Sequence, residues 1–131
     1  MEKGINAGAV NRELNQRVIG CAVEVHRTLG PGLLESVYEQ CLAHELSTSG
    51  IQFRTQHPAP VTYKNIQLEC GYRVDFLVEH ELILELKSVE RLTDLHRAQL
   101  VSYLRASGLG SGLLLNFNAT RLKDGLIRVV L

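Results

Sequence analysis

Two acids and a lysine in the middle of the chain could together hold a divalent cation and direct a water molecule. Asp75 lies in the stretch GYRVDFLV, and Glu85 and Lys87 lie two positions apart in the following stretch ELILELKSV. Mg²⁺ is commonly held by one or two carboxylates together with waters. Such an ion lowers the pKa of a bound water, and a nearby ammonium stabilises developing negative charge. The three residue types are therefore compatible with a metal site that activates a water molecule and neutralises charge on a phosphodiester.

A β-hairpin with a three-residue loop would bring the two acids face to face. Segments 71–78 and 81–89 are rich in strand-forming residues, and a loop of residues 79–81 centred on His80 sets Asp75 opposite Glu85. Side chains alternate across a strand, so each face of the hairpin can be written down. The charged face would carry Arg73, Asp75, Leu77, Ile83, Glu85 and Lys87, and the core face Val74, Phe76, Val78, Leu82, Leu84 and Leu86. A two-residue loop would mix polar and apolar side chains on both faces.

Two facing carboxylates repel each other unless a cation lies between them. The simpler interpretation of Glu85 and Lys87 is a solvated strand face or an ion pair, which is the usual role of charged residues on a strand. A lone Glu-x-Lys is weak support for a site. The matching register of Asp75 is what favours a metal site here.

The segment after the hairpin predicts a helix that ends near Gly108. Leu92, Leu95, His96, Gln99 and Tyr103 are spaced so that they share one face of it. From the pattern alone, Tyr103 is more typical of a core residue and Gln99 of a boundary residue. His96, and His26 in the first helix, are secondary candidates, because a lone histidine on a helix more often has a structural role.

Taken together, these residues resemble a known signature. The hairpin with Asp75 and Glu85-Leu86-Lys87, followed by Gln99-x-x-x-Tyr103, is similar to the active-site motif of the PD-(D/E)XK nuclease superfamily, nearest its RecB-like branch. Val74 stands where the superfamily name has proline, a common substitution among its members.

A second motif extends the resemblance. The stretch GPGLLESVYE contains Gly32-x-x-Glu35-x-x-Tyr38. With this motif, the sequence from about Asn11 to the C-terminus resembles the small bacterial and archaeal proteins called the GxxExxY family. Each residue of this motif also has a structural explanation. Gly32 would allow a sharp corner and Tyr38 would be a core residue. The negative charge of Glu35 would be stabilised by the helix dipole at the N-terminus of the second helix.

The resemblance implies an α/β fold with a restriction-endonuclease-like α-β-β-β-α-β core, in which helices flank a mixed central sheet. It also implies a site for Mg²⁺, with Mn²⁺ able to substitute, and hydrolysis of nucleic acid, with DNA the expected substrate. Asp75, Glu85 and the backbone carbonyl of Leu86 would be metal ligands, Lys87 would orient the attacking water, and Glu35 would complete the site. The residues expected to bind substrate or support the site are Gln99, Tyr103, Tyr38, Arg73 and His96.

The rest of the sequence supplies elements that could position these residues. An apolar stripe from the N-cap Asn11 to Leu29 predicts a first helix, and Gly30-Pro31-Gly32 ends it. A second helix follows from Leu34 to about Ser49. The remaining predicted strands are 51–56, 60–68, 111–117 and 126–131.

Length and composition fit one domain over residues 11–131 after a flexible tail of residues 1–10. The chain has 131 residues, and its 14 basic and 14 acidic side chains cancel. Cys21, Cys41 and Cys70 have no metal-binding spacing, so we expect reduced core thiols. The sequence has no apolar run of the ~20 residues needed to cross a bilayer. Its N-terminal segment also lacks the apolar stretch of a signal peptide. We therefore expect a cytoplasmic protein with no membrane partner.

Two functions remain open at this point. The first is a DNA nuclease, acting as an endonuclease or an exonuclease. The second is a non-catalytic nucleic-acid-binding or assembly module that keeps the nuclease fold and works with a larger protein partner. The neutral charge favours the second, because phosphate binding normally needs a basic track. The C-terminal third offers only scattered cations, which a homodimer could concentrate: Arg91, Arg97, Arg105, Arg121, Lys123 and Arg128.

Overall fold

Two helices joined by a tight corner open the fold. In the computed structural model, which describes residues 11–69 and 72–131, α1 spans Arg12–Leu29 and α2 spans Glu35–Thr48. The Asn11 side chain caps α1 by accepting a hydrogen bond from the Leu14 N–H, as its N-cap position predicts. At the corner, Gly30 and Gly32 adopt positive φ angles of 71° and 101°, which favour glycine. The predicted tail of residues 1–10 and Cys70 lie outside the described residues.

The central sheet has five strands in the order β1-β4-β5-β6-β7. Their bounds are Phe53–Pro58 for β1, Arg73–Val78 for β4, Leu82–Lys87 for β5, Ser111–Asn116 for β6 and Leu126–Val130 for β7. β5 and β6 are parallel and the other neighbours are antiparallel, so the sheet is mixed. α3, Asp94–Ser107, connects β5 to β6, and a short 3₁₀ helix, η2 at Leu122–Gly125, precedes β7. The sequence α2, β1, β4, β5, α3, β6 is the predicted α-β-β-β-α-β core.

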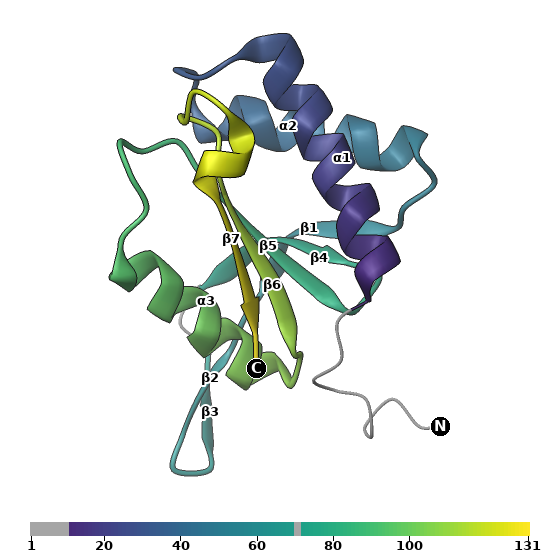
Figure 1. The fold of residues 1–131 in the computed structure, drawn as a ribbon. Coiled ribbons are helices and arrows are strands. Elements are labelled where there is room, and N and C mark those ends of the chain that lie inside the picture. The colour runs from purple at the N-terminus through teal and green to yellow at the C-terminus, as the bar shows by residue number, and fades with distance from the viewer. Residues whose placement is uncertain (1–10, 70–71) are drawn as a thin grey trace.

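One predicted strand is only partly correct. Residues 60–68 do not join the central sheet but form a separate two-stranded hairpin, β2 at Val61–Tyr63 and β3 at Ile66–Leu68. Figure 1 shows this hairpin projecting from the body of the protein. The cause is the turn at Lys64 and Asn65, where φ angles of 47° and 70° reverse the chain within two residues.

The sheet is covered by helices on both faces (Figure 1). α1 and α2 cover one face, over a core that includes Tyr38, Phe76, Leu84 and Phe117. α3 covers the other face, over a smaller core that includes Val74, Ile83, Leu100, Leu104 and Leu114. Cys21 is buried, Cys41 is half-buried, and both are free thiols. No described helix has both the length and the apolar character that crossing a membrane requires.

The predicted division of the β4–β5 hairpin into an apolar face and a charged face is only partly correct. Phe76, Leu84 and the other core-face residues of β5 do pack under α1 and α2. However, Ile83 and Leu77, expected on the charged face, pack under α3. Val74 also packs there, although regular alternation would place it with Phe76. The alternation therefore breaks at Asp75.

Candidate active site

The sheet forks at the two acids. β4 and β5 pair from Val78–Leu82 as far as Phe76–Leu84, where their regular pairing ends. Beyond that point β4 stays with β1, through the pair His57–Val74, while β5 stays with β6, through Lys87–Asn116. Asp75 and Glu85 follow directly after the last β4–β5 pair, one on each arm of the fork. This separation of the strands explains why the side-chain alternation of β4 breaks at Asp75.

Carboxylates replace the missing strand pairing. The Asp75 N–H donates to Glu85 Oε2 at 2.9 Å, and the Leu86 N–H donates to Asp75 Oδ2 at 2.7 Å. The loop between the strands is residues 79–81, with Glu79 and His80 at positive φ. The three-residue loop therefore brings the two acids together as the sequence predicts, and each acid is fixed by the backbone of the other strand.

Glu85 is in an unusual electrostatic environment. It is only 8% exposed, and its pKa is raised from 4.5 to about 7. Burial is the largest cause, because it disfavours the charged form, and the negative charge of Asp75 adds to it. The Asp75 N–H and the positive charge of Lys87 act in the opposite direction. Without further positive charge in the site, the Glu85 carboxyl is therefore partly protonated near pH 7.

Lys87 lies half-buried at the last position of β5, two residues beyond Glu85. Within residues 11–69 and 72–131 its ammonium forms no ion pair. The chain after it is held in place by Asn116, which accepts a hydrogen bond from the Val89 N–H and donates one to the Val89 carbonyl, at 3.1 Å and 2.9 Å. The ammonium is therefore available beside the acids, on a backbone with little freedom.

α2 contributes two further acids. Glu35 is the first residue of α2, and the Ser88 hydroxyl ties this end of the helix to the end of β5 by donating to the Leu33 carbonyl at 2.6 Å. The charge of Glu35 contributes to the raised pKa of Glu85. One turn later, Glu39 has its own pKa raised, chiefly by burial and then by the charges of Asp75 and Glu35, against a hydrogen bond that lowers it. Glu35 and Glu39 thus add negative charge near the fork.

Gln56 connects this helix to the acid pair. Its Nε2 donates to Glu39 Oε1 at 2.8 Å and to Asp75 Oδ1 at 3.3 Å. It lies between the paired residues Thr55 and His57 of β1, opposite Asp75, and adopts a φ of 50°. A residue with a Cβ is strained at this φ. In this backbone conformation the Gln56 side-chain amide reaches both carboxylates.

Tyr103 approaches the acids from α3, on the other face of the sheet. Its pKa is raised to about 12, mainly by burial and then by the negative charge of Glu85. The phenol therefore stays protonated and able to donate a hydrogen bond. Its ring meets the ring of Tyr72 edge to face, with centroids 5.7 Å apart. α3 lies close to β6 because Gly112 is there: a Cβ on Gly112 would come within 2.9 Å of Leu100 Cδ1.

Comparison with known families identifies the superfamily of the chain. A family model of the PD-(D/E)XK nuclease superfamily matches residues 12–129. The chain belongs to the PD-(D/E)XK nuclease superfamily. No curated protein and no solved structure matches the chain. The fold is accordingly the restriction-endonuclease-like fold, and nuclease-type function is the activity that the superfamily suggests.

The acids of this PD-(D/E)XK chain suit a hard, hydrated cation. Asp75 Oδ2 and Glu85 Oε2 each accept one backbone N–H, which leaves other oxygen lone pairs on both carboxylates. Mg²⁺ is held by few carboxylates and keeps several waters, so two acids are a sufficient protein donor set. Among residues 11–69 and 72–131, no three acids, histidines or cysteines are grouped as a metal site. Glu35 as a further ligand therefore stays a prediction.

Other predicted site residues have structural partners. Tyr38 is fully buried, stacks on Phe117 with ring centroids 4.5 Å apart, and holds the corner by donating to the Gly30 carbonyl at 2.6 Å. His96 Nδ1 accepts from the Thr93 N–H and caps α3. His26 Nε2 lies 2.8 Å from the Ala119 carbonyl. These three support the elements around the site rather than reaching into it.

Arg73, Gln99 and Leu95 complete the comparison with the sequence predictions. Arg73 Nη1 donates to the Gln56 carbonyl at 3.1 Å, so it supports the strained residue. Gln99 is half-buried and lines a cavity with Tyr103. Leu95, predicted to share their packed face, is instead 68% exposed, because the buried stripe of α3 runs through Leu100 and Leu104.

Glu39 and Gln56 are the site residues that sequence reasoning missed. Glu39 had a usable signal, because it follows Glu35 by four residues on a helix and so shares its face. Gln56 had none, because its role depends on a positive φ that nothing in its residue type indicates.

Proposed function

We propose that this chain is a divalent-metal-dependent nuclease that hydrolyses phosphodiester bonds in DNA, and that it belongs to the GxxExxY family within the RecB-like branch. The observation that carries the proposal is the pair Asp75 and Glu85, held in the fork by each other's backbone, with Lys87 beside them, which forms no ion pair within the described residues. A buried carboxylate held beside a second, half-buried carboxylate is costly for stability alone. Its presence beside an available ammonium supports a catalytic role.

The carboxylates of Asp75 and Glu85, together with the Leu86 carbonyl, would hold Mg²⁺, and Mn²⁺ would substitute for it. When bound, the ion supplies Lewis-acid chemistry: it lowers the pKa of water and neutralises charge on the phosphodiester. Both acids must be ionised to bind it. The raised pKa of Glu85 means that this carboxylate loses its proton near neutral pH.

The side chains around the acids have separate roles in the proposal. Lys87 orients the attacking water and stabilises negative charge that develops on the phosphate. Tyr103 keeps its proton and donates a hydrogen bond to substrate oxygen atoms. Gln56 holds Asp75 and Glu39 in place through its amide, and Glu35 completes the acidic site.

Replacement of Lys87 tests the proposal directly. The purified protein is incubated with Mg²⁺ or Mn²⁺ and with single-stranded, duplex and branched DNA and RNA. Lys87→Ala should lower cleavage by about 10²-fold or more, as expected for loss of a group that stabilises the transition state. Circular dichroism should show an unchanged fold. The exposed lysine of η2 provides the matched control, and Lys123→Ala should cut like the wild type.

Absence of cleavage by the wild type on every substrate would contradict the nuclease proposal. The balanced charge of the chain, 14 basic against 14 acidic side chains, favours the second candidate, a nucleic-acid-binding or assembly module. Nucleic-acid affinity without cleavage, and without divalent-metal binding in calorimetry, would support that candidate. A homodimer or a larger protein partner would then supply additional basic surface.

A further inference from the structure

A cavity of about 650 Å³ opens between α3 and the base of the β2–β3 hairpin. Tyr72, which precedes β4, lines it together with Gln99 and Tyr103 of α3, Val61 lines the hairpin side, and Arg105 supplies a guanidinium. The volume is in the range of small-molecule sites and is sufficient for one or two nucleotide units. The cavity is therefore large enough to be a binding site in its own right.

The cavity adjoins the acid pair through Tyr103. This residue lines the cavity, and the charges of Glu85 and Asp75 both act on its phenol. Gln99, one helical turn earlier, lines the same wall. A chain that occupied the cavity would continue toward the fork along this side of α3.

The lining suits a nucleobase. The Tyr72 side chain is 48% exposed, and the Tyr103 ring supports it edge to face. An exposed aromatic ring on a firm support is a stacking platform for unpaired bases. The Gln99 amide and the Ser102 hydroxyl lie on the same wall and offer hydrogen bonds. Among the described residues that line the cavity, Arg105 is the one with a charged side chain.

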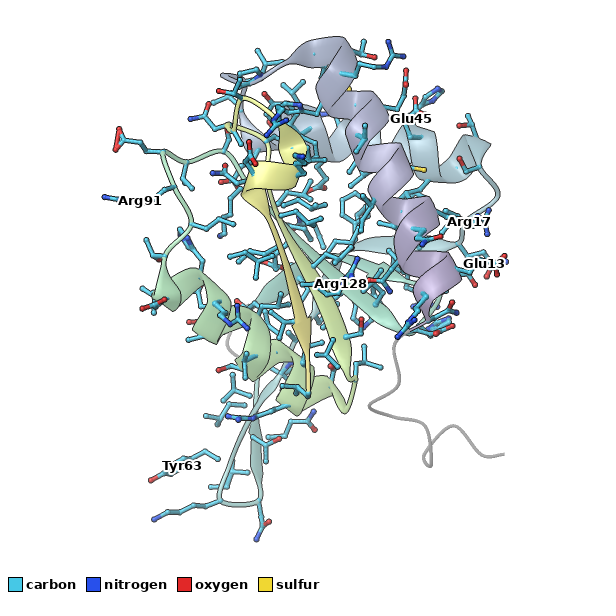
Figure 2. The ribbon with its side chains drawn as sticks, in the orientation of Figure 1. Glu13, Arg17, Glu45, Tyr63, Arg91 and Arg128 are labelled. Carbon is cyan, nitrogen blue, oxygen red and sulfur yellow. The ribbon has the colours of Figure 1, made fainter. Side chains whose placement is uncertain are left out.

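The charge distribution favours single strands over duplex. Duplex binding depends mainly on neutralising phosphates, and this chain has no net charge. Figure 2 shows Arg17, Arg91 and Arg128 in separate parts of the molecule, on α1, before α3 and on β7. Single-strand binding also uses phosphate contacts, but it gains a contribution from bases stacked on aromatic rings that duplex binding lacks. In an intact duplex the bases are already stacked and paired, so none is available to Tyr72.

We propose that this cavity binds unpaired bases, so that the substrate of the site is a nucleic acid with a single-stranded segment rather than uninterrupted duplex. The proposal rests on the proposed nuclease function for its cleavage step. Its binding step depends on Tyr72 and can be measured without catalysis. Tyr72 supplies the stacking surface, and the bound nucleic acid continues along α3 from the cavity to Asp75 and Glu85.

Binding is measured with a fluorescent single-stranded oligonucleotide in EDTA, by anisotropy at two salt concentrations. Tyr72→Ala should weaken binding roughly 5- to 100-fold, the effect of losing one stacked base. Tyr72→Phe keeps the ring and should bind like the wild type. Tyr63 is the matched control: it is 58% exposed and points away from the body near the tip of the hairpin (Figure 2). Tyr63→Ala should leave binding unchanged.

The outcomes separate this inference from the nuclease proposal. Equal binding by the wild type and Tyr72→Ala would overturn the cavity inference, and Lys87-dependent cleavage would still support the nuclease. Binding that depends on Tyr72, without any cleavage, would keep the cavity and overturn the nuclease. Sedimentation tests another occupant: a wild-type dimer that Tyr72→Ala disrupts, with oligonucleotide binding unchanged, would assign the cavity to a second copy and overturn the inference. Thermal unfolding of each variant checks its fold.

Discussion

The two ends of the β4–β5 hairpin differ in how their strands are held. At the loop end, the pairs Phe76–Leu84, Leu77–Ile83 and Val78–Leu82 form a regular ladder with apolar side chains packed on both faces. At the other end the ladder stops, and the carboxylates of Asp75 and Glu85 accept the backbone N–H groups. One hairpin therefore has a packed end and a forked end.

The difference shows how a sheet can make room for a polar site without leaving backbone groups unpaired. A buried N–H without a partner is costly, so strands normally cannot separate inside a core. Here the acids themselves satisfy the N–H groups and are held rigidly by them. The raised pKa of Glu85 shows that burying this charge is unfavourable. We therefore expect the packed end to stabilise the folded protein and the forked end to destabilise it.

The largest effect should come from the packed end. Leu82 is almost fully buried, and Leu82→Ala should lower the free energy of unfolding by about 2–5 kcal/mol through lost burial and a cavity. Chemical denaturation measures the change. Leu68→Ala makes the same change on the exposed β2–β3 hairpin and should cost less than about 1 kcal/mol. A similar cost at both positions would contradict the assignment of stability to the packed end.

A smaller effect should come from the charge of Glu85. Its pKa is about 7 in the folded protein and near 4.5 in the unfolded chain, so between these values the folded state holds more protons. The free energy of unfolding should therefore fall as pH rises from about 4.5 to 7, by about 3 kcal/mol at most, and stay level above that. Urea unfolding in EDTA measures this dependence.

Glu85→Gln should remove this fall, because the amide does not titrate. Saturating Mg²⁺ should also reduce it, since a bound cation favours the ionised carboxylate. A wild-type stability that is flat or rising over this pH range in EDTA, and equal to the Glu85→Gln profile, would show that the forked end carries no such cost.

The packed end was predictable from the sequence and the forked end only in part. The alternation of Leu82, Leu84 and Leu86 with the three-residue loop determines the register, and the register places Asp75 beside Glu85. The fork itself was not predictable, because it depends on β4 following β1 while β5 follows β6. Pairing between distant strands leaves no local pattern, so Val74 was assigned to the wrong face.

The surroundings of the site show the same limit. Glu35 lies at the start of α2, where the motif places it, because a helix start is determined by local sequence. The β2–β3 hairpin was missed because its turn at Lys64 and Asn65 lacks the glycine that normally indicates a two-residue reversal. The cavity beside α3 was missed with it, because the hairpin forms one of its walls.

The smallest expected effect comes from Gln56, where two substitutions distinguish backbone strain from the loss of the side-chain hydrogen bonds. Gln56→Gly and Gln56→Ala both remove the amide that contacts Glu39 and Asp75, and only glycine tolerates the φ of 50° without strain. The glycine variant should therefore be more stable than the alanine variant by about 1 kcal/mol. Both should lose cleavage activity to the same extent, because Asp75 loses the same hydrogen bond. Equal stabilities would show that the backbone at Gln56 is unstrained, and full activity in both variants would show that the fork alone positions Asp75.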